Sequence, residues 1–189
     1  MFAVGASYRW DRFVRPAIAA LAGATAIVCG LGAWQQLAPL SAPTIFPFSE
    51  TYYVKAAHAQ APAAIIAYAD KAIAVAPARA ENWVLLAYAY QKADHHLSPR
   101  ALSALRQSYV VSALSNDAHD FRLSEIFANW PVMPDDIRGQ AITEARMYVD
   151  QPKGQALLSH LQATVPDLGA RLTLGMIQFE FHRRIGLSQ

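Results

Sequence analysis

The sequence has little cysteine and none of the common cofactor motifs. Cys29 is the one cysteine among 189 residues, which excludes a disulfide within the chain and a Cys-x-x-Cys metal or redox pair. The chain also lacks a glycine-rich phosphate loop and a haem-attachment motif. We therefore expect this protein to bind no metal and no cofactor.

Charge is the second scarce property. Charged residues make up 16% of the chain and the net charge is +2, whereas about a quarter of a typical soluble protein is charged. A charge this small, without a basic stripe interleaved with aromatics, gives no sign of nucleic acid binding, and we expect none. The hydrophobic fraction is 54% and much of it is alanine, which predicts an all-α fold.

One long segment has no charge at all, from Pro16 to Ser49. Within it, residues 16–37 supply the run of about 20 mostly apolar residues that a transmembrane helix needs. The positive-inside rule places residues 1–15 in the cytoplasm, because three arginines precede the run: Arg9, Arg12 and Arg15. We expect a single-pass inner-membrane protein with its C-terminal domain in the periplasm.

Three other interpretations of the apolar run stay open. A cleaved signal peptide has the same basic and apolar regions, with a weak small-x-small site at 40–42. A lipoprotein would use Cys29, although Val28 fits that signal poorly. A buried core helix is the third, but the run has no polar face and the arginines lie on one side of it.

Residues 38–48 hold three evenly spaced prolines, Pro39, Pro43 and Pro47, and are expected to form an extended linker. The remaining residues, 49–189, are expected to form a helical domain. Its prolines fall between the apolar segments, where they separate short helices. The pattern predicts antiparallel helices at 50–59, 62–76, 80–93, 99–113, 117–129, 135–149, 153–164 and 167–184.

Part of this domain carries a repeat pattern. Ala72 lies five residues before Pro77, and an aromatic, a leucine, a small residue and a tyrosine follow at Trp83, Leu86, Ala87 and Tyr90. This spacing resembles the tetratricopeptide repeat, and it continues imperfectly through Ala101, Leu105 and Ser108. The resemblance covers about residues 62–114 and implies a TPR-like array of antiparallel helical hairpins that binds a protein partner.

A looser resemblance covers the stretch from Ala104 to Tyr109 and the Asn129-Trp130-Pro131 sequence. Together they look like small membrane-anchored repeat proteins of alphaproteobacteria. That resemblance implies a link to envelope polysaccharide production.

Aromatic residues on the helices are the candidates for partner binding. A concave helical array offers a groove that such side chains can line, although aromatics on helices more commonly pack in the core. The candidate partner-binding residues are Trp83, Tyr90, Phe121, Phe127 and Trp130, to which Tyr88 can be added.

Polar clusters give weaker candidates. His95 and His96, beside Asp94, are either metal ligands or an exposed turn. Asp117, His119 and Asp120 are either a carboxylate–histidine base or the acidic start of a helix. The basic end of the last helix, at Arg183 and Arg184, either complements the helix dipole or meets lipid headgroups or a partner.

These features predict a non-enzymatic function. We expect a membrane-anchored adaptor, scaffold or accessory subunit in a cell-envelope assembly, with polysaccharide synthesis or export as one setting. The alternatives are an accessory subunit of a membrane-bound oxidoreductase and an envelope-polymer hydrolase. The hydrolase would need an acid and a base in a cleft.

Overall fold

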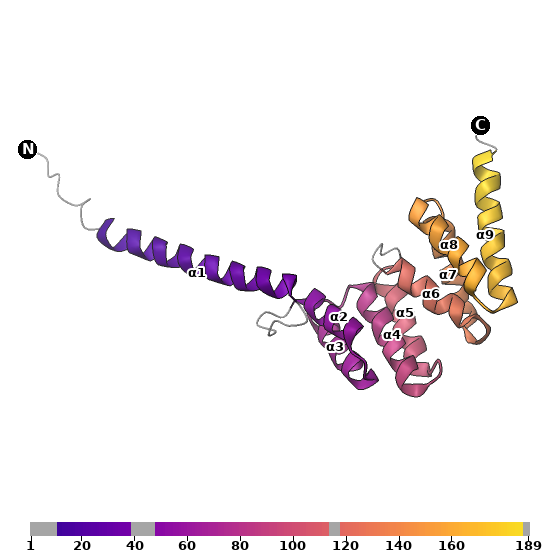
Figure 1. Cartoon of the computed structure of the whole chain (residues 1–189), viewed down its shortest axis with the longest axis horizontal. Helices are drawn as coiled ribbons and strands as arrows, with labels where there is room; N and C mark the ends of the chain where they lie inside the picture. Colours follow the sequence, from indigo (N-terminus) through magenta and orange to yellow (C-terminus); the bar gives the residue numbers. More distant parts are fainter. Residues whose placement is uncertain (1–10, 39–47, 114–117, 187–189) are drawn as a thin grey trace, which may run out of the picture.

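The computed structural model describes residues 11–38, 48–113 and 118–186, and of residues 11–20, 23 and 36 it describes only the backbone. Over these residues the chain is entirely helical, as the composition predicts (Figure 1). The helices are α1 (Asp11–Leu37), α2 (Ser49–His58), α3 (Pro62–Val75), α4 (Ala80–Asp94), α5 (Pro99–Val111), α6 (His119–Ala128), η1 (Trp130–Val132), α7 (Asp135–Tyr148), α8 (Pro152–Thr164) and α9 (Leu168–Gly186).

The helix starts follow from local sequence. Three helices begin with proline, Pro62, Pro99 and Pro152, whose missing N–H is not needed in the first turn. The Ser98 hydroxyl caps α5 by accepting from the Ala101 N–H, and the Asp167 carboxylate caps α9 by accepting from the Ala170 N–H at 2.8 Å. The predicted helices are therefore confirmed to within two residues at nearly every end.

The structure adds a 3₁₀ turn after α6 that the sequence did not predict. The helix ends at Ala128, and a 3₁₀ turn follows at Trp130–Val132. Pro131 explains the change, because proline cannot donate the backbone hydrogen bond that would continue an α-helix. The predicted caps of this helix, Asn116 and Asp117, lie outside the described residues, as does most of the predicted linker.

The long N-terminal helix α1 extends away from the other helices (Figure 1). Its C-terminal end contacts α2, where the Gln35 side-chain amide donates to the Thr51 hydroxyl at 3.2 Å. The apolar side chains of Leu21, Ile27 and Val28 are exposed. Over the residues that the structure describes, no helix combines the length and the apolar character needed to cross a membrane.

The helices α2 to α9 pack as four successive hairpins: α2–α3, α4–α5, α6–α7 and α8–α9 (Figure 1). The first helices of neighbouring hairpins contact each other, since α2 contacts α4, α4 contacts α6, and α6 contacts α8. Among the second helices, α5 contacts α7, and α7 contacts α9. The first helices thus form one face of the array, and the second helices form the other.

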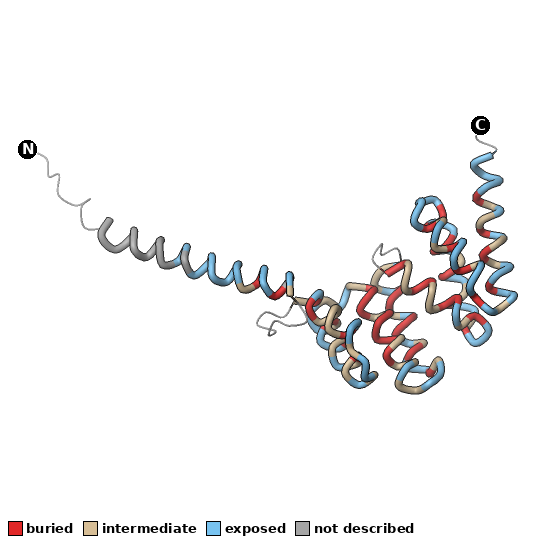
Figure 2. The backbone as a smooth tube through the Cα atoms, in the orientation of Figure 1, coloured by how far each residue is buried: buried red, intermediate tan, exposed pale blue. Residues whose placement is uncertain are grey.

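Small residues allow these hairpins to approach closely. The interfaces of α3, α4 and α5 bury a series of alanines that leave almost no accessible surface: Ala69, Ala72, Ala80, Ala87, Ala89, Ala101 and Ala104. Larger side chains such as Val84 and Leu105 fill the space beside them. Buried residues are accordingly dense along α4 and α5, at the centre of the array (Figure 2).

Candidate functional site

A groove on the face of the first helices is the best candidate for a binding site. We call it the inner groove. It has a volume of about 450 Å³ and lies where α2, α4 and α6 meet, with residues of α3 and of the turn before it completing the wall. It is lined by Tyr53, Ala56, Ala57, Ala59, Gln60, Ile65, Leu85, Tyr88, Lys92 and Phe121.

The helical period explains why these side chains meet. Leu85, Tyr88 and Lys92 follow one another at three- and four-residue spacing, which places them on one face of α4. Tyr53 on α2 lies on one side of this row, and Phe121 on α6 lies on the other. The site therefore draws residues from three hairpins.

The floor of the inner groove is apolar and its walls are aromatic. Ile65 and Leu85 are buried beneath it. Tyr88 and Phe121 are half-buried and meet edge to face, with ring centroids 5.6 Å apart and planes at 65°. The exposed Lys92 ammonium lies 5.4 Å from the centre of the Tyr88 ring, so one rim is positively charged. This combination suits an apolar or aromatic side chain on a peptide that carries acidic neighbours.

Phe121 and Tyr88 are the predicted partner-binding aromatics that line the inner groove. Trp83 is half-buried, and its indole N–H donates to the Pro77 carbonyl at 2.8 Å. Tyr90 is half-buried beneath the guanidinium of Arg100, which lies 4.5 Å from its ring centre. Trp83 and Tyr90 thus pack at the turns before and after α4.

Phe127 and Trp130 lie in the core of the third hairpin. Phe127 is fully buried, Trp130 retains 8% of its accessible surface, and the two rings stack with centroids 4.8 Å apart. Their contacts are with the chain itself. In this conformation they stabilise the array, and a partner has no access to Phe127.

A buried polar cluster joins α5, α6 and α7. Arg122 and Glu144 are fully buried, with Nη2 and Oε1 2.5 Å apart. The same carboxylate also bonds His119 Nδ1 and accepts from the Tyr109 hydroxyl at 2.7 Å. Burial, together with the charge of Glu144, raises the pKa of Tyr109 well above its usual value.

The remaining donors of Arg122 go to the backbone. They reach the carbonyls of Ser108, Ser112 and Ala113 at 2.8–3.2 Å. The Glu144 carboxylate is thus bound by three side chains, those of Arg122, His119 and Tyr109. This is the hydrogen bonding of a structural ion pair.

The predicted carboxylate–histidine site is divided by the fold. His119 faces the buried cluster, whereas Asp120 accepts from the Tyr148 hydroxyl at 2.7 Å and pairs with Lys153 at 2.9 Å. Burial disfavours the charge of Asp120, but the hydrogen bonds from Tyr148 and Lys153 outweigh it and lower its pKa. Asp117 lies outside the described residues.

The histidine turn is a helix end. His95 has φ of 59°, the left-handed conformation that commonly terminates a helix, and His96 Nδ1 lies 2.7 Å from the Asp94 carbonyl oxygen. Asp94 itself is bound by Arg100. Within the described part of the chain, no three histidine, cysteine or acidic side chains are arranged to hold a metal ion.

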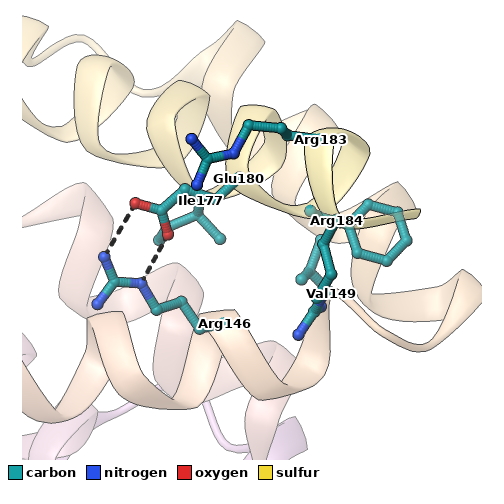
Figure 3. Close-up of a pocket in the computed structure, with 7 residues that line it drawn as sticks. Arg146, Val149, Ile177, Glu180, Arg183 and Arg184 are labelled. Atoms are coloured by element: carbon teal, nitrogen blue, oxygen red, sulfur yellow. Dashed lines mark hydrogen bonds and ion pairs between the residues drawn. The ribbon is translucent and has the colours of Figure 1, made fainter. Parts of the chain in front are cut away.

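A second pocket, of about 490 Å³, lies between α7 and α9 (Figure 3). Three arginines line it, but Arg146 forms a two-point contact with Glu180 at 3.1 and 3.3 Å, and Arg184 pairs with Asp150. The carboxylates neutralise most of its positive charge, so it is a poor site for an anion.

Sequence reasoning did not identify Glu144, Tyr53 or the role of Leu85. One signal for Glu144 was present. It follows Ile137 and Ala141 at the spacing of a buried helix face, where a charged residue has to be paired.

No known protein family, characterised protein or solved structure matches this chain.

Proposed function

We propose that this protein is a membrane-anchored adaptor whose helical-hairpin array holds a segment of a partner protein in the inner groove. The observation that carries the proposal is the groove itself. Tyr88, Phe121 and the apolar floor make a half-exposed cavity on the face shared by three hairpins. A peptide segment can dock its apolar side chains into a hydrophobic groove of this kind.

The arrangement of the hairpins supports a TPR-like assignment beyond residues 62–114. Successive first helices begin at Ser49, Ala80, His119 and Pro152, roughly 31 to 39 residues apart, near the 34 residues of that repeat. The alternation of first-helix and second-helix contacts is typical of helical-hairpin repeat arrays. On this assignment the inner groove is the concave face on which such arrays bind partners.

The proposed anchor is the apolar run of residues 16–37 within α1. Its support is the absence of charge from Pro16 to Ser49 and the exposed apolar side chains of Leu21, Ile27 and Val28. The Gln35–Thr51 contact would then join the anchor directly to the first hairpin. The groove would be held at a fixed distance from the membrane, in a cell-envelope assembly such as polysaccharide synthesis or export machinery.

The groove is tested by site-specific photocrosslinking in the native host. A benzoyl-phenylalanine placed at Tyr88 should give one discrete crosslinked protein after irradiation. The same group at Val110, which is 75% exposed on α5, serves as the control because it lies on a second helix away from the groove. Identical crosslinking at both positions, or none at Tyr88, would refute groove binding.

The anchor is tested separately. The protein should stay in the membrane pellet after alkaline carbonate extraction, and alkaline phosphatase fused to its C-terminus should be active. Release by carbonate, or an inactive fusion, would count against a periplasmic domain on a transmembrane helix. The crosslinked partner from the Tyr88 variant would decide between polysaccharide machinery and an oxidoreductase complex.

A further inference from the structure

The outer side of the last helix carries a narrow row of exposed apolar side chains. Leu168, Leu172, Met176 and Phe179 are exposed to 65%, 60%, 62% and 68%, and they recur at three- and four-residue spacing on one face of α9. We call this row the α9 stripe. It extends about 16 Å along the helix, at a rise of 1.5 Å per residue.

The opposite face of α9 is packed. Ala170, Leu174, Ile177 and Phe181 are buried, and α9 contacts α7 and α8 on that side. Among the helices that the structure describes, α9 is the last of the array (Figure 1). Repeat arrays normally close with a polar outer face, whereas the outward face of α9 is apolar at these four residues.

The position in the array indicates what shape fits the stripe. In the array, the second helix α3 of the first hairpin packs against the first helix α4 of the next. The α9 stripe occupies the equivalent outward side of the last second helix. A single helix laid along it would therefore continue the same packing.

The width of the stripe favours a helix over a lipid surface. Its apolar residues occupy a narrow seam, which is the geometry of helix-to-helix packing. A helix that inserts into a membrane surface presents a broader apolar face.

Charge around the stripe selects the partner further. Arg171 and His182 lie along one edge of it, eleven residues or three turns apart, and Arg183 lies at its C-terminal end, four residues after Phe179. Over the described residues, neither Arg171 nor Arg183 has an ion-pair partner, and no carboxylate lies on the stripe. Glu180 points to the α7 side, where it pairs with Arg146 (Figure 3).

The same charges disfavour a second copy of this chain. A second α9 stripe carries the same basic residues and, over the described residues, no carboxylate on its face, so it offers no acidic group to pair with Arg171 and Arg183. We propose that the α9 stripe docks an amphipathic helix of a partner protein whose apolar seam is flanked by acidic residues. This surface is separate from the inner groove, so one adaptor would hold two partner segments.

A designed peptide tests the surface without knowledge of the partner. The probe is a fluorescent helical peptide of about three heptads with leucine at the seam and glutamate beside it, and its matched partner replaces every glutamate with lysine. Binding is measured by fluorescence anisotropy to the full chain in phosphatidylcholine nanodiscs, with empty nanodiscs as the blank. We expect the acidic peptide to bind at least about tenfold more tightly than the basic one.

Two variants locate the binding. The double variant Leu172→Ser, Phe179→Ser should weaken binding of the acidic peptide by about tenfold or more. Val110→Ser, at an exposed apolar site on α5, should leave its binding unchanged. Arg171→Glu with Arg183→Glu should reverse the preference in favour of the basic peptide. These exposed substitutions are expected to keep the native circular dichroism spectrum.

Three results would overturn the proposal. Equal binding of both peptides would show that the α9 stripe does not select acidic residues on its partner. Pairing of nanodiscs that the Leu172→Ser, Phe179→Ser variant abolishes would identify a second copy as the occupant. Vesicles of equal parts phosphatidylglycerol and phosphatidylcholine give the third result. If they capture nanodiscs that carry the wild-type protein but not nanodiscs that carry the Leu172→Ser, Phe179→Ser variant, the occupant is a lipid surface. None of these results bears on crosslinking at Tyr88, so groove binding and docking on the α9 stripe fail independently. The nanodisc assay itself rests on the proposed anchor, which carbonate extraction tests separately.

Discussion

Arg122 on α6 and Glu144 on α7 form a fully buried ion pair at 2.5 Å, and it is the main polar contact inside the third hairpin. The guanidinium also stacks over the Tyr109 ring of α5, with its carbon 4.1 Å from the ring centre. It thereby links the second hairpin to the third at the point where α5 ends. The predicted repeat resemblance ends at about residue 114, so this ion pair joins the last hairpin that the resemblance covers to the next one.

Breaking this pair should strongly destabilise the fold. Glu144→Gln leaves the buried Arg122 charge without its counter-ion, and loss of one partner of a buried pair costs about 3–5 kcal/mol. The measurement is urea unfolding of the full chain followed by circular dichroism. Asp136→Asn is the matched control, because Asp136 pairs with Arg106 across α5 and α7 but both side chains are about half exposed. The Asp136→Asn substitution should lower the free energy of unfolding by no more than about 1 kcal/mol.

The double variant Arg122→Met, Glu144→Leu removes both charges and should recover much of the loss. If Glu144→Gln and Asp136→Asn lower the free energy of unfolding equally, the buried pair does not link the second hairpin to the third.

The sequence predicts the helices better than it predicts the site. Prolines at Pro62, Pro99 and Pro152 mark helix starts because their effect is local. The small residues in α3 to α5 were likewise predicted to lie at helix contacts, because their spacing follows the helical period. The Arg122–Glu144 pair was not, because 22 residues separate its members and only tertiary packing brings them together.

The aromatic candidates show a second limit. Phe121 and Phe127 lie on the same helix, six residues apart, and therefore point about 120° apart around it. Which face meets the core depends on how α6 docks against α4 and α7, and the sequence of α6 does not determine that. Phe121 consequently lines the inner groove, while Phe127 is buried.

Asp94 should make stability depend on pH in the acid range. Hydrogen bonds from Arg100, supported by Ser98, lower its pKa from 3.8 to about 2. A lowered carboxyl pKa stabilises the fold above the unfolded value of 3.8, and that stabilisation is lost as the pH falls toward 2. Asp94→Asn should therefore lower the melting temperature at pH 7 but have little effect at pH 2.

The control for that measurement is Asp135→Asn, because the Asp135 side chain is 99% exposed. It should change the melting temperature much less at pH 7. An Asp94→Asn effect of the same size at pH 7 and pH 2 would show that the Asp94–Arg100 contact does not couple to protonation.

Tyr148 should remain protonated when most tyrosines ionise. Burial, with the hydrogen bond to Asp120, raises its pKa to about 12. Since the folded state then keeps a proton that the unfolded state loses near pH 10, stability should fall as the pH rises from 10 to 12. Difference absorbance of wild type and Tyr148→Phe isolates this group, and titration of Tyr148 near pH 10 would contradict its buried placement.

Gly154, in the first turn of α8, lies tightly against the backbone of Tyr148 at the end of α7. A Cβ atom at this position would collide with the backbone carbonyl of Tyr148, in the turn that the Gln151 N–H closes by donating to the same oxygen at 3.0 Å. Backbone cannot move aside as a flexible side chain can, so Gly154→Ala should destabilise the protein by about 1–3 kcal/mol.

Gly139 in α7 gives the matched test, because a Cβ there meets nothing within 4 Å. Gly139→Ala should stabilise the protein by about 0.5–1 kcal/mol through higher helix propensity. Opposite signs in urea unfolding would establish the tight α7–α8 turn, whereas stabilisation by both substitutions would show that the turn is looser than this structure has it.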